Sequence, residues 1–216
     1  MKIEPYNERI QKLTRLGEPK FREPWRDYAA EFGLTEADRD EVIRMFEDTS
    51  WYDLKPKNPA YWSGIHAGRA LAFLGPDEDT FTALICVLEE NPEDDWLCED
   101  VPEILGRLGE PALLAVTDYL NDPHAVPEAK CSLADFYNAL IKHHRALKPT
   151  ALAALRRLIA DFNRHDPAFN GLVVAWLIEL MVKSALPSIR IAYLSNKVEP
   201  SICGYLEDVE AKFREM

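Results

Sequence analysis

A pair of apolar helical stretches that recurs about every 35 residues constrains the fold of this chain more than any other feature. The copy at residues 94–122 is the best formed, and related copies lie on both sides of it. Leu71, Leu105 and Leu140 mark equivalent positions in successive copies, at offsets of 34 and 35 residues. A two-helix period of this length, without strand signals, predicts an all-α stack in which each pair buries its apolar side against its neighbours.

The same period predicts the domain organisation. We expect a single right-handed α-α superhelix, or α-solenoid, over residues 1–216. Residues 1–59 should form an N-terminal helical cap and a connection, residues 60–195 about four helical pairs, and residues 196–216 a C-terminal capping helix. A chain of 216 residues with 47% hydrophobic residues is long enough to bury such a core. No Ser/Gly-rich run marks a linker.

Capping signals predict where several helices begin. Thr35, with Asp38 three residues later, resembles a capping box, in which side chains satisfy the free backbone N–H groups of a helix start. Asp100, followed by Pro102 and Glu103, predicts the start of the first helix in the second pair. Two further stretches are expected to be unbroken helices, at about residues 127–144 and 202–213.

The charge of the chain is concentrated in one window. Between Arg69 and Arg107 there are eleven Asp and Glu residues but no Lys or Arg, whereas the whole chain has 37 acids and 25 bases. Nearly all of the net charge of -12 therefore lies in this short part of the sequence. Such a charge argues against binding to nucleic acids or anionic membranes, because both require a basic surface.

One group in this window has no basic neighbour in the sequence: Asp94, Asp95 and Glu99, beside Trp96. The group fits two interpretations. It is either a solvated turn with acids at a helix N-terminus, or a docking site that attracts a protein partner with a basic surface. A calcium loop is disfavoured, because the D-x-D-x-D-G pattern followed by a bidentate Glu is missing. These four residues are the first candidate binding site.

No motif in the sequence supports catalysis. There is no G-x-S-x-G elbow, no phosphate-binding loop and no G-x-G-x-x-G fingerprint. The histidines lack the i, i+4 spacing of a helical zinc site, and His143 and His144 should point to different sides of one helix. We therefore expect no enzymatic activity, no metal and no cofactor.

Hydropathy and cysteine usage favour a cytoplasmic protein. The longest apolar run, at residues 172–178, is far shorter than a membrane span requires, and the first residues lack the apolar region of a signal peptide. The cysteines form no CxxC pair and lie among apolar neighbours, which predicts buried, reduced thiols. They are Cys86, Cys98, Cys131 and Cys203.

Several segments resemble a known repeat family. IHAGRALAFLG (residues 65–75) and DVPEILGRLGEPALLAVTDYL (residues 100–120) are similar to HEAT-like repeats of the phycobilisome-lyase type, in which an A-x-x-A-L-x-x-L-G helix precedes a second helix rich in Ala and Leu. The stretch ALPSIRIAYLSNKVEPSICGYLEDVEAKF (residues 185–213) resembles the last repeat and tail of a group of uncharacterised bacterial HEAT-like proteins. Some of those proteins carry a C-terminal Cys/His metal-binding module. This chain departs from that pattern, with only Cys203 near its end and no histidine after His165.

These observations lead to hypotheses from two functional classes. The first is a non-catalytic scaffold or adaptor whose acidic face binds a basic protein partner, with an immunity-type protein that masks a basic toxin as a variant. The second is what the resemblance implies, a bilin lyase-like or chromophore-binding protein, in which Trp62, His66 and Arg69 would contact an acidic tetrapyrrole. A histidine in an apolar helix is more often a hydrogen-bonded core residue, so His66 has both interpretations. The oligomeric state stays open.

Overall fold

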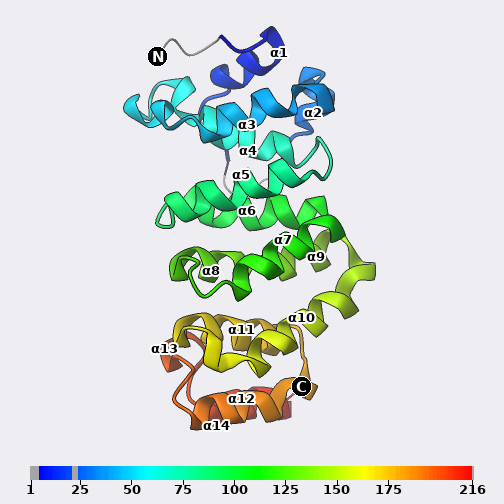
Figure 1. The fold of residues 1–216 in the computed structure, drawn as a ribbon, viewed down its shortest axis with the longest axis vertical. Coiled ribbons are helices and arrows are strands. Elements are labelled where there is room, and N and C mark those ends of the chain that lie inside the picture. Colours follow the sequence, from blue (N-terminus) through cyan, green and yellow to red (C-terminus); the bar gives the residue numbers. More distant parts are fainter. Residues whose placement is uncertain (1–4, 21–23, 216) are drawn as a thin grey trace.

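The computed structural model describes residues 5–20 and 24–215. The α-helices of this part of the chain are α1 (Glu8–Gln11), α2 (Tyr28–Phe32), α3 (Arg39–Glu47), α4 (Ser63–Leu71), α5 (Glu78–Glu90), α6 (Asp95–Leu108), α7 (Glu110–Asn121), α8 (Pro127–Leu133), α9 (Phe136–His143), α10 (Lys148–Ala160), α11 (Pro167–Glu179), α12 (Leu186–Leu194), α13 (Pro200–Cys203) and α14 (Leu206–Glu215). No strand is present in these residues, which confirms the predicted all-α class. The helices form an elongated stack that runs from α1 at one end to α12 and α14 at the other (Figure 1).

The predicted capping box forms at the turn before α3. The carboxylate of Asp38 accepts hydrogen bonds from the backbone N–H of Thr35 at 2.8 Å and from its hydroxyl at 3.0 Å. Asp38 is buried and also pairs with Arg9, whose Nη2 atom lies 2.7 Å from its Oδ1 atom. One carboxylate thus starts a helix and ties α1 to the turn that precedes α3.

The start of α6 differs from the prediction. The helix begins at Asp95, and Asp94 caps it: its Oδ1 atom accepts hydrogen bonds from two free backbone N–H groups, at 2.9 and 3.0 Å. Asp100 does not act as a cap, because an arginine of α4 binds its carboxylate. Pro102 lies inside the helix. Proline in a helix interior costs about 3 kcal/mol, so the earlier cap and the packing of the longer helix must outweigh that cost.

Two stretches that were expected to be continuous helices are each broken into two. Residues 127–144 form α8 and α9, separated by Ala134 and Asp135. Buried residues lie on both sides of this break, so the hydrophobic pattern alone could not reveal it. Residues 202–213 are interrupted at Gly204, whose φ of 95° lies in the left-handed region that favours glycine. The break before α9 leaves Asp135 exposed at the surface.

The first helices of successive pairs pack on one another in the order α4, α6, α9. Between α6 and α9 the approach is close because Gly106 faces Ala139. A Cβ atom at Gly106 would lie only 2.4 Å from the Cβ atom of Ala139. One hydrophobic core runs through the stack and includes the three leucines that mark the repeat, Leu71, Leu105 and Leu140, each with 0% exposure.

The expected burial of the cysteines is only partly correct. Cys203 is buried, Cys98 and Cys131 are half-buried, and Cys86 is exposed. All four thiols are free. Cys86 lies on the side of α5 that is turned away from the core, so apolar neighbours in the sequence did not determine which way its side chain faces.

Candidate functional site

One side of α6 carries large polar and aromatic side chains instead of core residues. Trp96, Glu99, Glu103 and Arg107 follow one another at intervals of three and four residues, which places them on one face of the helix. Glu99 is exposed and the other three are half-buried. This row is the centre of the candidate site. At one end Trp96 lies beside α4, and further along the row Glu99 and Glu103 lie near α9 and α11.

The row borders a shallow pocket to which α9 and α11 also contribute. The pocket has a volume of about 200 Å³. It is lined by Glu99, Pro102, Glu103, Asp135, Asn138, Ala139, Lys142 and Trp176. We call the surface made by Trp96, Glu99, Asp135, Trp176 and Glu179 the α6–α9–α11 face.

Three carboxylates of this face lie near one another without a basic partner. The pKa of Asp135 is raised to about 6, mainly because the surrounding protein desolvates it and also because of the negative charges of Glu99 and Glu179, against a hydrogen bond from Trp176 that lowers it. None of these three acids forms an ion pair with a described residue. Like charges that destabilise one another in this way favour the binding of a cation between them.

Glu103, one turn after Glu99 on α6, has basic side chains that balance its charge. Its carboxylate pairs with Arg107 at 3.1 Å, with Lys142 at 3.1 Å and with His143 at 2.7 Å. Burial acts to raise the pKa of Glu103, but the hydrogen bonds from His143 and Lys142 outweigh it, so the pKa is lowered. The prediction that Glu103 serves a helix start is wrong, because the residue links α6 to α9.

His66 is engaged inside the protein. It is 3% exposed. Its Nε2 atom lies 2.7 Å from the carbonyl oxygen of Gly17, which can only accept, so Nε2 donates; Nδ1 accepts from the hydroxyl of Tyr28 at 2.8 Å. Burial lowers the pKa of His66 to about 4. Its interpretation as a hydrogen-bonded core histidine therefore fits the structure.

Arg69 is likewise occupied. Its Nε atom lies 2.6 Å from Oδ2 of Asp100 and its Nη2 atom 3.0 Å from Oδ1, while Nη1 donates to the carbonyl oxygen of Lys20 at 3.2 Å. Arg69 is 3% exposed and Asp100 6%. Burial raises the pKa of Asp100 and the arginine opposes that effect, and the bidentate geometry is that of a carboxylate. With its donors in use, Arg69 is not available to bind the acidic groups of a chromophore.

Aromatic rings connect this buried pair to the α6–α9–α11 face. The guanidinium carbon of Arg69 lies 4.8 Å from the ring centre of Trp25 and 5.4 Å from that of Trp96. Trp96 also meets Trp62 edge to face, with the ring centres 5.4 Å apart. Trp62 is 8% exposed and is therefore a packing residue. Trp96 is half-buried and is the member of this group that reaches the surface.

The structure thus separates the residues that were predicted as sites. Trp96 and Glu99 lie on the candidate face. Asp94 serves as the cap of α6, and Asp95 is the exposed first residue of that helix, where the helix dipole stabilises an acid. The remaining candidates, Trp62, His66 and Arg69, lie in the interior.

Sequence reasoning missed three members of the face: Asp135, Trp176 and Glu179. They lie far from the acidic window along the chain, so charge counting in a local window could not find them. One signal was available for Asp135, which follows Glu99 by 36 residues, close to one repeat period. Equivalent positions of stacked repeats lie next to each other in space, so the period could have indicated this pair.

Two further properties concern the described residues only. They contain no group of three or more His, Cys, Asp and Glu side chains placed to hold a metal ion. In the same residues, no helix combines the length and the apolar character that crossing a bilayer would require.

The α6–α9–α11 face combines carboxylates with the half-buried indole rings of Trp96 and Trp176. Carboxylates attract a cation by charge, and the face of an indole ring attracts it through the quadrupole of the ring. The arrangement is therefore suited to a Lys or Arg side chain. No protein-family model, curated protein or solved structure matches this chain.

Proposed function

We propose that the chain is a non-catalytic protein-interaction scaffold whose α6–α9–α11 face binds a basic segment of a protein partner. The observation that carries this proposal is the group of three carboxylates without an ion pair to a described residue, Glu99, Asp135 and Glu179; desolvation raises the pKa of Asp135, and the charges of the other two add to that effect. A Lys or Arg side chain placed among them would replace repulsion by attraction. Trp96 and Trp176 would pack against its aliphatic part.

We further propose that the stack is a HEAT-like, right-handed superhelix of about four helical pairs, within a single domain. The successive packing of α4, α6 and α9 supports this, because these helices hold the equivalent positions of the sequence repeat. In a solenoid of this kind, residues from neighbouring repeats combine into one extended binding surface. The α6–α9–α11 face would be such a surface, built from three successive units of a cytoplasmic protein.

The proposal predicts binding that depends on charge. The test is fluorescence anisotropy with a labelled, ten-residue Lys/Arg-rich peptide, and with a matched peptide in which Gln replaces each Lys and Arg. Only the basic peptide should bind, and raising the ionic strength should weaken the complex because salt screens exposed charges. The double variant Glu99→Lys/Glu179→Lys should reduce the affinity by about tenfold or more, which corresponds to about 1.4 kcal/mol.

The matched control is Asp118→Lys, a charge reversal at an exposed position of α7 that lies outside the face. It should leave the affinity within about twofold, because exposed charges a Debye length or more apart are largely screened. Equal losses in the control and in the double variant would show general attraction to an acidic protein and would refute a defined face. Masking of a basic toxin would use the same contacts, and protection of cells that express such a toxin would distinguish that variant.

A further inference from the structure

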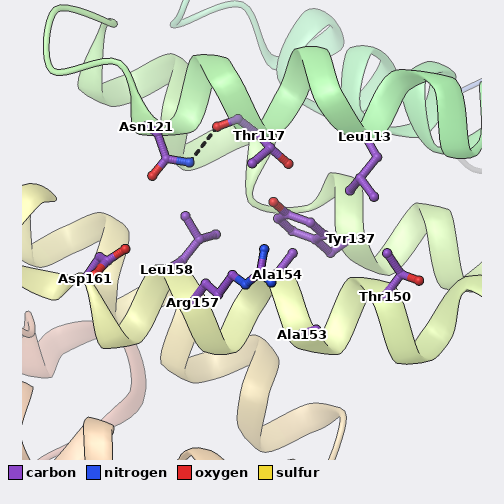
Figure 2. A pocket seen from close by; sticks show the side chains of 10 residues that line it. All are labelled: Leu113, Thr117, Asn121, Tyr137, Thr150, Ala153, Ala154, Arg157, Leu158 and Asp161. Carbon is purple, nitrogen blue, oxygen red and sulfur yellow. Dashed lines mark hydrogen bonds between the residues drawn. The ribbon is translucent and has the colours of Figure 1, made fainter.

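A second surface, on different helices, carries an inference of its own. A cavity of about 290 Å³ lies between α7 and α10, with α9 beneath it (Figure 2). Its lining residues are Leu113, Thr117, Asn121, Tyr137, Thr150, Ala153, Ala154, Arg157, Leu158 and Asp161. None of them belongs to the α6–α9–α11 face. The volume lies just below the range of about 300–1,000 Å³ that is typical of small-molecule sites.

The helix spacing explains why this cavity exists. Leu113, Thr117 and Asn121 follow at intervals of four along α7 and so form one row. On the facing side of α10, Ala153 and Ala154 occupy the middle of the opposite row. Because alanine side chains are too short to reach α7, the two helices leave a hollow whose walls are apolar and whose ends are polar.

The base of the cavity holds a polar group without a partner. The side chain of Tyr137 is 0% exposed, and its hydroxyl forms no hydrogen bond with any described residue. Burial raises the pKa of Tyr137 to about 12, against an opposing effect of the nearby Thr117 side chain, so the hydroxyl is neutral. Figure 2 shows this side chain extending from α9 into the space between the two helices. An unpaired buried hydroxyl is unfavourable, and a ligand oxygen would satisfy it.

Both signs of charge lie at the same cavity. Arg157, in the last turn of α10, and Asp161, the residue just after that helix, are exposed, yet neither forms an ion pair within the described part of the chain. Asn121 stands opposite Asp161 at one end (Figure 2). The amide Nδ2 of Asn121 donates to the carbonyl oxygen of Thr117 at 2.8 Å. The Oδ1 atom of Asn121 therefore remains as an acceptor beside Asp161.

We propose that this cavity binds a small zwitterion with an apolar side chain, of the α-amino-acid class. The carboxylate of the ligand accepts hydrogen bonds from Arg157 and from the hydroxyl of Tyr137. The ammonium group lies at the end formed by Asp161 and Asn121. The apolar side chain packs on Leu113 and the alanines of α10. The combination of a donor pair, an acceptor pair and an apolar wall selects against ligands that lack any one of the three parts.

Isothermal titration calorimetry with L-leucine tests the proposal. A ligand of this size should bind with a Kd on the order of 1 mM or tighter. Three probes each remove one part: 4-methylpentanoate lacks the ammonium, 3-methylbutylamine lacks the carboxylate, and glycine lacks the apolar side chain. Each should bind at least about tenfold more weakly than L-leucine. For the first two probes the reason is a lost charged contact, worth at least about a factor of ten; for glycine it is the lost burial of the side chain, worth about 1.5–3 kcal/mol, which is about a factor of ten or more.

Variants of the protein locate the site. Arg157→Ala and Asp161→Asn should each reduce the affinity for L-leucine about tenfold or more. The matched control is Arg156→Ala, which removes the neighbouring arginine of α10; that residue contacts Ser184 rather than the cavity. Tyr137→Phe should weaken binding as well. Because Arg157 and Asp161 are exposed, their variants test the site even if Tyr137→Phe unfolds the protein. The proposal is overturned by no heat of binding for L-leucine, by equal binding of all four probes, or by an equal loss in Arg156→Ala.

Discussion

Arg69 of α4 and Asp100 of α6 form a bidentate ion pair in which both side chains are almost completely buried, with N–O distances of 2.6 and 3.0 Å. The pair joins the first helices of two successive units. It takes up the carboxylate that the sequence suggested as a helix cap, and Asp94 caps α6 instead. The contact is one of the main links between the N-terminal part of the stack and its centre.

Breaking this pair from one side should be strongly destabilising. We expect Asp100→Ala to lower the free energy of unfolding by about 3–5 kcal/mol, because it leaves a buried guanidinium without its counter-charge. The double variant Arg69→Met/Asp100→Leu should cost much less, since it removes both charges together. Urea denaturation of the three proteins measures both effects. A double variant that is as unstable as Asp100→Ala would contradict this account.

Removing the charge of Asp135 should stabilise the protein, whereas removing that of Asp100 should destabilise it. Its pKa is raised from 3.8 to about 6, so the folded state binds a proton more readily than the unfolded state and stability falls as the pH rises from about 4 to 6. We expect Asp135→Asn to stabilise the protein at pH 7, by no more than about 1 kcal/mol because the exposed carboxylate is screened by solvent. Below pH 4 the gain should vanish. Thermal unfolding at pH 7 and pH 4 measures the difference, and a destabilised variant at pH 7 would show that this carboxylate is needed for packing.

His66 should make the protein sensitive to acid. Burial lowers its pKa from 6.5 to about 4, so the unfolded state binds the proton first and stability falls as the pH drops from about 6.5 to 4. The full shift corresponds to about 3 kcal/mol, at 1.36 kcal/mol per unit of pKa. Urea denaturation should show a loss of about 2 kcal/mol between pH 7 and pH 5, because the remainder is lost only below pH 5, and His66→Gln should remove part of it. Part should remain, because burial also lowers the pKa of His165 to about 4. A wild-type protein that is equally stable at both pH values would refute a buried neutral His66.

Two glycine-to-alanine variants should have opposite effects. At Gly106 the added Cβ atom would lie 2.4 Å from Ala139 Cβ and 2.8 Å from the backbone of α9, so Gly106→Ala should destabilise the protein by about 2 kcal/mol or more through overpacking. At Gly64, in α4, the nearest atoms would lie at 3.7 and 3.9 Å. Gly64→Ala should be neutral or stabilising by up to about 1 kcal/mol, because alanine favours a helix. Thermal denaturation of both variants tests the close contact between α6 and α9.

The sequence repeat was sufficient to predict the all-α class and the buried positions Leu71, Leu105 and Leu140, since a helical period determines which side of each helix is covered. It was not sufficient to predict where each helix begins and ends. Asp100 has the residue type of a cap, but tertiary pairing with Arg69 uses its carboxylate, and no local rule contains that partner. The break before α9 escaped detection because buried residues lie on both sides of it, so the hydrophobic pattern continues across it.

The candidate site was predictable only in part. Trp96 and Glu99 belong to the acidic window and could be found from local charge. Trp176 and Glu179 come from α11, and their position depends on how the helices stack, which one sequence does not specify. His66 and Arg69 were ambiguous because helix periodicity alone does not show that the segment around Gly17 and Lys20 covers them.

That covering segment has a consequence for any attempt to shorten the protein. The carbonyl oxygens of Gly17 and Lys20 receive hydrogen bonds from His66 and Arg69 of α4. A fragment that began at the first repeat would therefore expose His66 and Arg69, which are buried in the full chain. It would also admit water to the ion pair between Arg69 and Asp100. The segment from Gly17 to Lys20 therefore covers α4, and the smallest independently folding unit should include it.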